Sequence, residues 1–117
     1  MKRAALTNYA PTQDVVSTIN DWKGNPAYFL HSNGQPLVST FEGPANANDW
    51  HAIKDQTKSF FIPDWSSLGA RKAVSRGDGV ADGLFNWGAW PEGKQRTNWD
   101  LDASYLIFLN NTRTYMA

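Results

Sequence analysis

The sequence predicts an α/β domain built on a parallel sheet, and three observations support this class. From Pro36 onward, short apolar runs alternate with segments of helical periodicity. The runs are continuous rather than alternating in polarity, as a sheet covered on both faces requires. Each run stops at a glycine, a proline or a polar residue. An open doubly wound sheet and part of a closed (β/α)₈ barrel both fit this pattern.

Chain length limits the barrel alternative. The chain has 117 residues, whereas a complete (β/α)₈ barrel needs about 250. A chain of this size holds one domain at most. We therefore expect residues 1–117 to form a single domain that, if it is a barrel, supplies roughly three to four strand–helix units.

The chain begins with a helix and a turn. Apolar residues at helical spacing predict a helix over Thr12–Trp22, and Gly24-Asn25-Pro26 ends it. Asn33-Gly34 predicts a tight turn before the first strand.

Strands and helices then alternate. The expected strands are Leu37–Phe41, Phe60–Ile62, Gly83–Trp87 and one that starts at Tyr115-Met116. The expected helices run from Asn46 or Asn48 through Lys54, from Ser66 or Ser67 through Val74, and from Asp100 or Asp102 through Leu109. Asn, Ser and Asp are favoured at helix starts because their side chains accept hydrogen bonds from the first free N–H groups.

Polar and aromatic residues follow the first three strands. In parallel α/β folds, the carboxyl ends of the strands point to one face, where active sites assemble. The side chains expected to meet there are Glu42, Asp64, Trp65, Asn86, Trp87 and Trp90. The sequence therefore predicts a site of acids, an amide and indole rings from distant segments.

Two carboxylates on one face suggest glycoside hydrolysis. This reaction needs two carboxyl groups that flank the scissile bond, one as acid and one as base or nucleophile. From position alone, Glu42 and Asp64 are the candidate pair. The alternative is structural, because either carboxylate can cap a helix, accept backbone N–H bonds, or pair with Lys54 or Arg71.

Other acidic and aromatic residues are expected to be structural. Asp82 precedes its strand, which places it on the opposite face of the sheet, where residues serve stability. Trp22 and Trp50 lie within predicted helices, and we expect both rings to pack against the sheet.

The aromatic content favours sugar binding. The chain contains six Trp, four Tyr and six Phe. The C–H faces of a pyranose stack on flat rings, which supply a large contact area. A core rich in aromatic residues is the alternative explanation.

Composition argues against several other functions. Eleven basic residues balance eleven acidic ones, which gives neither the basic face that nucleic acid requires nor a polybasic segment for anionic membranes. There is no cysteine, and the two histidines lack the spacing of metal ligands, so we expect no metal site.

The longest apolar run, Tyr105–Leu109, is too short for a bilayer, and residues 1–20 lack a signal peptide. Asn110-Asn111-Thr112 fits the glycosylation sequon.

Several unusual motifs occur in order along the chain. They are Val38-Ser39-Thr40-Phe41-Glu42-Gly43, Asp49-Trp50, Phe60-Phe61-Ile62-Pro63-Asp64-Trp65-Ser66-Ser67-Leu68-Gly69-Ala70, Asp82-Gly83-Leu84-Phe85-Asn86-Trp87-Gly88-Ala89-Trp90-Pro91, Asp102, Tyr105 and Tyr115-Met116. In order and spacing they resemble glycoside hydrolase family 71, the fungal α-1,3-glucanases or mutanases. The resemblance runs from about Tyr28 to Ala117.

The resemblance implies a (β/α)₈ TIM-barrel catalytic domain that hydrolyses α-1,3-glucan without a metal or an organic cofactor. It implies an inverting mechanism, with acid and base on opposite faces of the bond, and extracellular or cell-wall use. Relative to the family, residues 1–117 would be a central piece of the catalytic domain, truncated at both ends.

The resemblance also changes the expected roles of the two carboxylates. The family's acid/base pair is expected in an Asp-x-x-Glu segment that would lie beyond Ala117. Glu42 and Asp64 then bind substrate or tune charge, in conflict with the interpretation from position, and we prefer the family interpretation for catalysis. Trp65, Asn86, Trp87 and Trp90 stay candidates for substrate binding.

Three functions are left open. The chain is a fragment or truncated relative of an endo-α-1,3-glucanase, a non-catalytic carbohydrate-binding remnant that uses strand-end Trp residues, or a doubly wound domain with an unrelated ligand. For the first two, the partner is α-1,3-glucan. An incomplete barrel exposes unpaired strand edges, so we also expect marginal stability or self-association.

Overall fold

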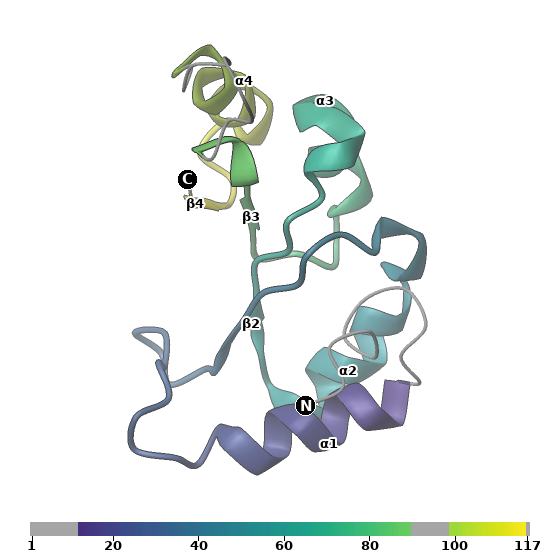
Figure 1. Cartoon of the computed structure of the whole chain (residues 1–117), viewed down its shortest axis with the longest axis vertical. Coiled ribbons are helices and arrows are strands. Elements are labelled where there is room, and N and C mark those ends of the chain that lie inside the picture. Colours follow the sequence, from purple (N-terminus) through teal and green to yellow (C-terminus); the bar gives the residue numbers. More distant parts are fainter. Residues whose placement is uncertain (1–11, 90–98, 117) are drawn as a thin grey trace.

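The computed structural model describes residues 12–89 and 99–116, in which helices and short strands alternate (Figure 1). The α-helices are α1 (Thr12–Trp22), α2 (Asp49–Thr57), α3 (Gly69–Arg76) and α4 (Trp99–Leu109). The strands are β1 (Leu37–Val38), β2 (Phe60–Phe61), β3 (Gly83–Phe85) and β4 (Thr114–Met116). Short 3₁₀ helices lie at η2 (Pro44–Asn46), η3 (Ser66–Leu68) and η4 (Trp87–Ala89). The predicted α/β class is confirmed.

The strands pair in parallel, and neighbours in space are neighbours in sequence. Leu37 of β1 lies opposite Phe60 of β2, and β3 pairs with β4 in the same sense. Asp64, just after β2, forms parallel bridges to both Phe41 and Phe85, and so joins the two pairs. The resulting order is β1-β2-β3-β4.

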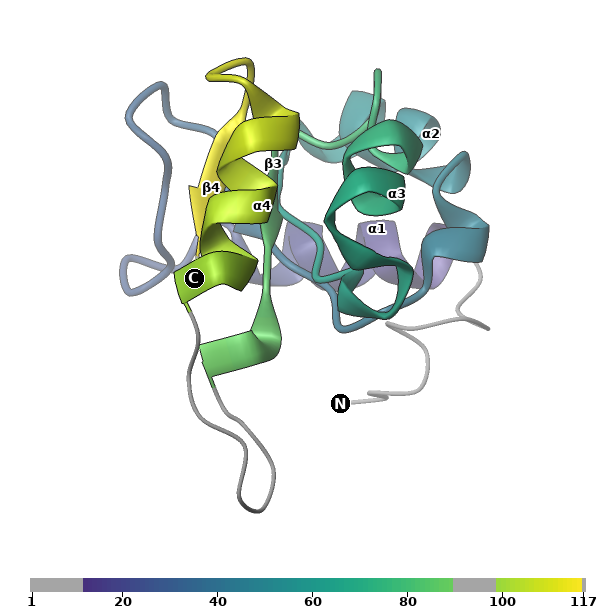
Figure 2. The ribbon, with the colours of Figure 1, turned by 90° about the horizontal axis from the view of Figure 1, so that it is seen from above.

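The helices follow one another around one side of the strands. In Figure 1, α1 and α2 lie at the bottom, α3 lies above them, and α4 lies at the top. Helix α1 packs against α2, and α3 packs against α4. The view from above shows α4 beside β4, with which it is in contact (Figure 2). None of the described helices is long and apolar enough to cross a bilayer.

Aromatic rings and the apolar stripe of α1 form much of the core. Val15, Val16 and Ile19 are buried, as the helical periodicity predicted. Trp50 stacks on Phe61 with ring centroids 3.6 Å apart, which confirms its expected packing on the sheet. The same expectation for Trp22 was wrong, because this last residue of α1 lies past the buried stripe and is 55% exposed.

Asp82 holds the amino ends of β2 and β3 together. Its Oδ2 accepts a hydrogen bond from the backbone N–H of Phe61 at 2.8 Å and forms an ion pair with Lys54 at 2.8 Å. Lys54 also donates to the carbonyl of Val80 at 2.8 Å. The predicted structural role of Asp82 is therefore confirmed, and Lys54 is committed to this end of the sheet.

Candidate functional site at the carboxyl ends of the strands

Residues that follow β1, β2 and β3 meet at one edge of the sheet. The backbone N–H of Glu42 donates to the carbonyl of Asp64 at 2.7 Å, and that of Asn86 donates to the carbonyl of Met116 at 3.1 Å. We call Glu42, Asp64, Ser66, Asn86 and Trp87 the rim. Its members come from three separate strand ends, because parallel strands bring their carboxyl ends to the same face.

Asp64 is the most unusual side chain of the rim. It is fully buried. Its Oδ1 accepts hydrogen bonds from the Ser66 backbone N–H, at 3.0 Å, and from the Ser66 hydroxyl. Its Oδ2 has no hydrogen-bond partner among the described residues. Burial raises the pKa of Asp64, the bonds from Ser66 oppose this rise, and the charge of Glu42 adds to it.

Glu42, by contrast, caps a short helix with its carboxylate. Its carboxylate accepts hydrogen bonds from the Ser67 backbone N–H at 3.0 Å and from the Ser67 hydroxyl at 2.6 Å. These bonds satisfy a free N–H group at the start of η3, where a helix lacks internal partners. The backbone of Glu42 is left-handed, with φ at 62°. The sequence left open that these carboxylates serve as structural caps. Both oxygens of Glu42 do so, but only one oxygen of Asp64 does.

Ser66 links two strand ends, a role that the sequence analysis missed because it treated this residue only as a helix cap. Its hydroxyl contacts Asp64 and also lies 3.2 Å from Oδ1 of Asn86. It accepts a hydrogen bond from the backbone N–H of Trp87 at 3.3 Å. Asn86 is buried and accepts a further bond from the Gly88 N–H at 3.0 Å. The signal that could have identified Ser66 is its position, two residues after the strand-end acid Asp64.

Two tyrosines lie behind the rim. Tyr105 is buried and stacks on Tyr115, with ring centroids 5.2 Å apart. Burial raises the pKa of Tyr105. A hydrogen bond with Ser66 lowers this pKa, whereas the charges of Asp64 and Glu42 raise it. Tyr115 donates to Oδ1 of Asp102 at 2.5 Å, and burial together with this bond raises its pKa well above the usual range. Both phenols are therefore neutral hydrogen-bonding groups.

Exposed aromatic rings lie next to the rim. Phe41 is 59% exposed and Trp87 is 46% exposed, and their rings meet edge to face with centroids 6.0 Å apart. Phe85 packs against the same indole, also edge to face, at 5.7 Å. The sequence analysis named Trp87 and treated Phe41 only as part of a strand. Together these rings offer an apolar surface beside a buried carboxylate.

Trp65, by contrast, does not join this surface. Trp65 is 1% exposed and packs edge to face on Phe61, with centroids 6.1 Å apart. Its ring is part of the core and presents no face to a ligand. Trp90 lies outside the described residues.

The rim combines buried polar groups with an exposed apolar surface. The Oδ2 of Asp64 has no partner among the described residues, but it is buried. The exposed rings of Phe41 and Trp87 can stack on an apolar face of a ligand. Within residues 12–89 and 99–116, no group of three His, Cys, Asp or Glu side chains is arranged to hold a metal ion.

Comparison with known proteins gives a consistent family assignment. The chain is 32% identical over 95 residues to the glucan endo-1,3-alpha-glucosidase agn1 of Schizosaccharomyces pombe, a match that covers 70% of this chain and 22% of that protein. It is 29% identical over 116 residues to the mutanase Pc12g07500 of Penicillium rubens, which covers 91% of this chain and 24% of that protein. The chain thus spans less than a quarter of the length of these relatives. No solved structure matches it. The sequence model of glycosyl hydrolase family 71 matches residues 3–117, and the chain therefore belongs to that family.

Proposed function

We propose that this chain is part of the (β/α)₈ barrel of an endo-α-1,3-glucanase and that its rim binds α-1,3-glucan. Family membership and the names of the two relatives support a glucan substrate. The chain spans only 22% and 24% of the length of those relatives. The hydrolytic activity of the whole protein is therefore part of the proposal.

The strand order supports the barrel part of the proposal. In a barrel of this class, strands follow one another in sequence order and the helices form one outer layer. In a doubly wound sheet, the strand order reverses at a switch point and helices cover both faces. The described strands keep the order β1-β2-β3-β4, and the helices in Figure 1 lie around one side of them.

One observation carries the binding part of the proposal, the exposed pair of rings that Phe41 and Trp87 form at the rim. Flat aromatic rings stack on the apolar faces of sugars. The Oδ2 of Asp64 has no partner among the described residues and is buried. A glucose hydroxyl would bond to it only after the side chain rotates toward the surface.

The hydrogen bonds of Glu42 argue against a catalytic pair within the rim. Hydrolysis with inversion needs one carboxyl group to protonate the leaving oxygen and another to activate water. Both oxygens of Glu42 are already engaged by Ser67, whereas Asp64 has one free oxygen. We therefore propose that Asp64 binds and orients glucan, and that the acid/base pair of the family lies in an Asp-x-x-Glu segment outside this sequence.

Binding and hydrolysis can be measured in one experiment. The chain is incubated with insoluble α-1,3-glucan, and the retained protein and the released reducing ends are both quantified. We expect retention without release. Asp64→Asn and Trp87→Ala should each reduce retention about tenfold, which corresponds to the loss of roughly one good contact.

Matched controls separate the rim from general surface effects. Asp55→Asn removes an exposed carboxylate of α2, and Phe29→Ala removes an exposed ring from the loop before β1. Both should leave retention unchanged. Equal losses in control and rim variants would rule out binding at the rim. Release of reducing ends that is abolished by Glu42→Gln or Asp64→Asn would instead assign the catalytic pair to this chain.

A further inference from the structure

The turn after α4 carries the one glycosylation sequon of the sequence. Asn110-Asn111-Thr112 has the required pattern of an asparagine, any residue except proline, and a serine or threonine. No other asparagine in the sequence is followed by this pattern. Helix α4 ends at Leu109 and β4 begins at Thr114. The sequon therefore lies in the short connection between a helix and a strand.

The side chain of Asn110 is available for modification. The residue is exposed, and its backbone is left-handed, with φ at 49°. Its backbone N–H donates to the carbonyl of Leu106 at 3.0 Å and so closes the helix end. Its side-chain amide forms no hydrogen bond with any described residue, whereas the amide of Asn33, for comparison, donates to the side chain of Gln35 at 2.6 Å.

The turn lies at the end of the sheet opposite to the rim. At the amino end of β4, the N–H of Thr114 donates to the carbonyl of Asp82 at 3.2 Å. At its carboxyl end, the carbonyl of Met116 accepts from Asn86, a rim residue, at 3.1 Å. Connections from a helix to the next strand lie at the amino ends, whose residues serve stability rather than ligand binding. A glycan attached to Asn110 therefore leaves the rim open.

A hollow beside the turn gives the first sugar room. Its volume is about 490 Å³, and Asn111, Thr112 and Arg113 line it on the side of the turn. His31 and Asp82 also line it. These side chains carry donors and acceptors that can bond to the hydroxyl groups of a sugar.

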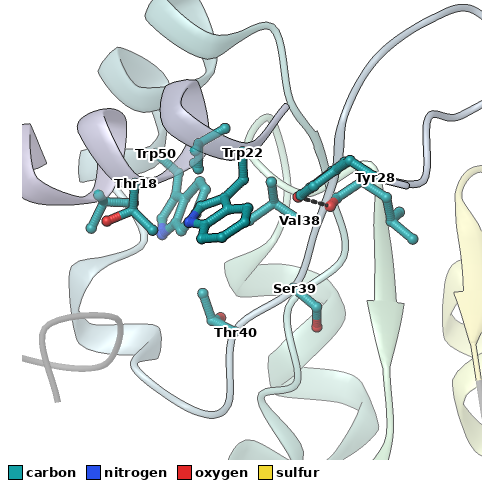
Figure 3. Close-up of a pocket in the computed structure, with 10 residues that line it drawn as sticks. Thr18, Trp22, Tyr28, Val38, Ser39, Thr40 and Trp50 are labelled. Atoms are coloured by element: carbon teal, nitrogen blue, oxygen red, sulfur yellow. Dashed lines mark hydrogen bonds between the residues drawn. The ribbon is translucent and has the colours of Figure 1, made fainter. Parts of the chain in front are cut away.

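An apolar pocket of about 500 Å³ lies in a different part of the molecule (Figure 3). Trp22 of α1, Val38 of β1 and Trp50 of α2 line it. Strands β1 and β4 are the first and last of the four, and α1 and α4 lie at opposite ends of the molecule in Figure 1. The position of Asn110 is thus separate from this pocket as well as from the rim.

We propose that Asn110 carries an N-linked glycan. The donor is a lipid-linked oligosaccharide, in which a pyrophosphate joins the first sugar to the lipid. The Nδ2 of Asn110 forms a bond to the anomeric carbon of that sugar, and the bond from this carbon to the pyrophosphate oxygen breaks. The lipid pyrophosphate leaves, and the amide loses one proton. The presence of the chain in the secretory pathway rests on the proposed function, because an insoluble glucan cannot cross a membrane to reach its enzyme.

The hydroxyl of Thr112 indicates when the transfer takes place. A hydroxyl at this position is part of the sequon. In the folded chain it donates to the carbonyl of Leu109, which also accepts the N–H of Thr112 at 2.9 Å. The hydroxyl is therefore engaged once the turn has formed, so the transfer precedes folding of this segment. The fold then needs only to keep the side chain of Asn110 exposed, as it does.

Production of the full chain behind a cleavable secretory leader in a fungal host tests the inference. Intact mass spectrometry is expected to show the 13.1 kDa chain with one oligosaccharide added. A peptide-N-glycosidase should remove the oligosaccharide and leave an aspartate at position 110, which peptide mapping locates. A secreted chain without an oligosaccharide would overturn the proposal.

Two neighbouring glycine variants provide the matched control. Asn110→Gly and Asn111→Gly each place glycine at a left-handed backbone angle, φ 49° and 59°, which glycine adopts without strain, so both should fold. The oligosaccharide should be lost from Asn110→Gly and kept by Asn111→Gly. Thr112→Ser keeps the hydroxyl and should be modified, whereas Thr112→Ala should not. An oligosaccharide on Asn110→Gly would assign the modification to another residue.

Glucan retention reports on the two proposals separately. The secreted chain is bound to insoluble α-1,3-glucan before and after enzymatic removal of the oligosaccharide. We expect equal retention, because Asn110 and the rim lie at opposite ends of the strands. Higher retention after removal would contradict this placement. Equal absence of retention in the two forms would count against glucan binding at the rim, while the mass of the chain would still establish the glycan.

Discussion

Asp64 and Ser66 form two hydrogen bonds that converge on a single carboxylate oxygen. The backbone N–H of Ser66 lies 3.0 Å from Oδ1 of Asp64, and the Ser66 hydroxyl donates to the same atom. The second oxygen has no partner within the described residues, although the whole side chain is buried. One oxygen therefore anchors the turn into η3, and the other is a buried position that a proton can occupy.

Asp64→Asn is expected to raise the thermal stability of the chain at neutral pH. Burial raises the pKa of Asp64 in the folded state, so the folded chain holds this proton more tightly than the unfolded chain, whose aspartate has a pKa of about 3.9. The stability from the protonated form is complete below that value and is lost as pH rises through the folded-state pKa. Asparagine carries no charge, so its contribution to stability does not change over this pH range. The gain in Tm should therefore grow from about pH 4 to pH 7, as measured by circular dichroism.

Asp55→Asn is the matched control for this pH dependence. Asp55 is exposed on α2, where a carboxylate and an amide are similarly solvated, so its Tm difference should be small. If Asp64→Asn instead lowers Tm by more at pH 7 than at pH 4, the carboxylate acts as an ionised cap and its burial does not dominate.

Glu42 should be more costly to replace by alanine than by glycine. Both substitutions remove the two bonds to Ser67, and loss of a helix cap costs about 0.5–2 kcal/mol. Alanine also keeps a Cβ at φ 62°, where L-residues are disfavoured by roughly 1–2 kcal/mol relative to glycine. Urea denaturation should therefore rank the free energy of unfolding as parent, then Glu42→Gly, then Glu42→Ala. The reverse order of the two variants would mean that the cap geometry needs a side chain.

The sequence predicted the order and type of the elements because local signals and tertiary structure agree along this chain. Helix α1 has the predicted bounds, Thr12–Trp22, since its apolar spacing and its Gly-Asn-Pro stop coincide. The strands are shorter than the apolar runs. Gly83–Trp87 was expected as a strand, but pairing ends at Phe85 and η4 follows. A run of apolar residues marks burial, whereas strand length depends on which neighbours offer hydrogen bonds.

The candidate site was less predictable than the fold. The rule for strand ends correctly brought Glu42, Asp64 and Asn86 to one edge. It did not distinguish a carboxylate with both oxygens bonded from one with a free oxygen, because that difference depends on the hydroxyls of Ser66 and Ser67. Nor did it separate Trp65 in the core from Trp87 at the surface. Both rings directly follow strands, and only the path of the next turn decides which is buried.

Asp82→Ala is expected to destabilise the chain without affecting glucan retention. The substitution leaves the Phe61 N–H without its acceptor and leaves Lys54 without its ion-pair partner. An unsatisfied, partly buried donor costs about 1–3 kcal/mol. Because Asp82 lies at the amino ends of the strands, the rim should keep its shape. The free energy of unfolding and glucan retention are measured on the same preparation. A loss of retention at temperatures where the variant is fully folded would contradict the separation of the two ends.

Gly83→Ala is expected to destabilise the chain, because position 83 has no room for a side chain. A Cβ at position 83 would lie 2.5 Å from the carbonyl oxygen of Thr114, so β3 and β4 would have to move apart. Overpacking of this kind typically costs about 1–3 kcal/mol, and here it also weakens the pairing of β3 with β4. Gly24→Ala is the matched control, since nothing lies within 4 Å of its Cβ. Urea denaturation of both variants tests the difference. Equal stabilities would show that β3 and β4 are not closely paired.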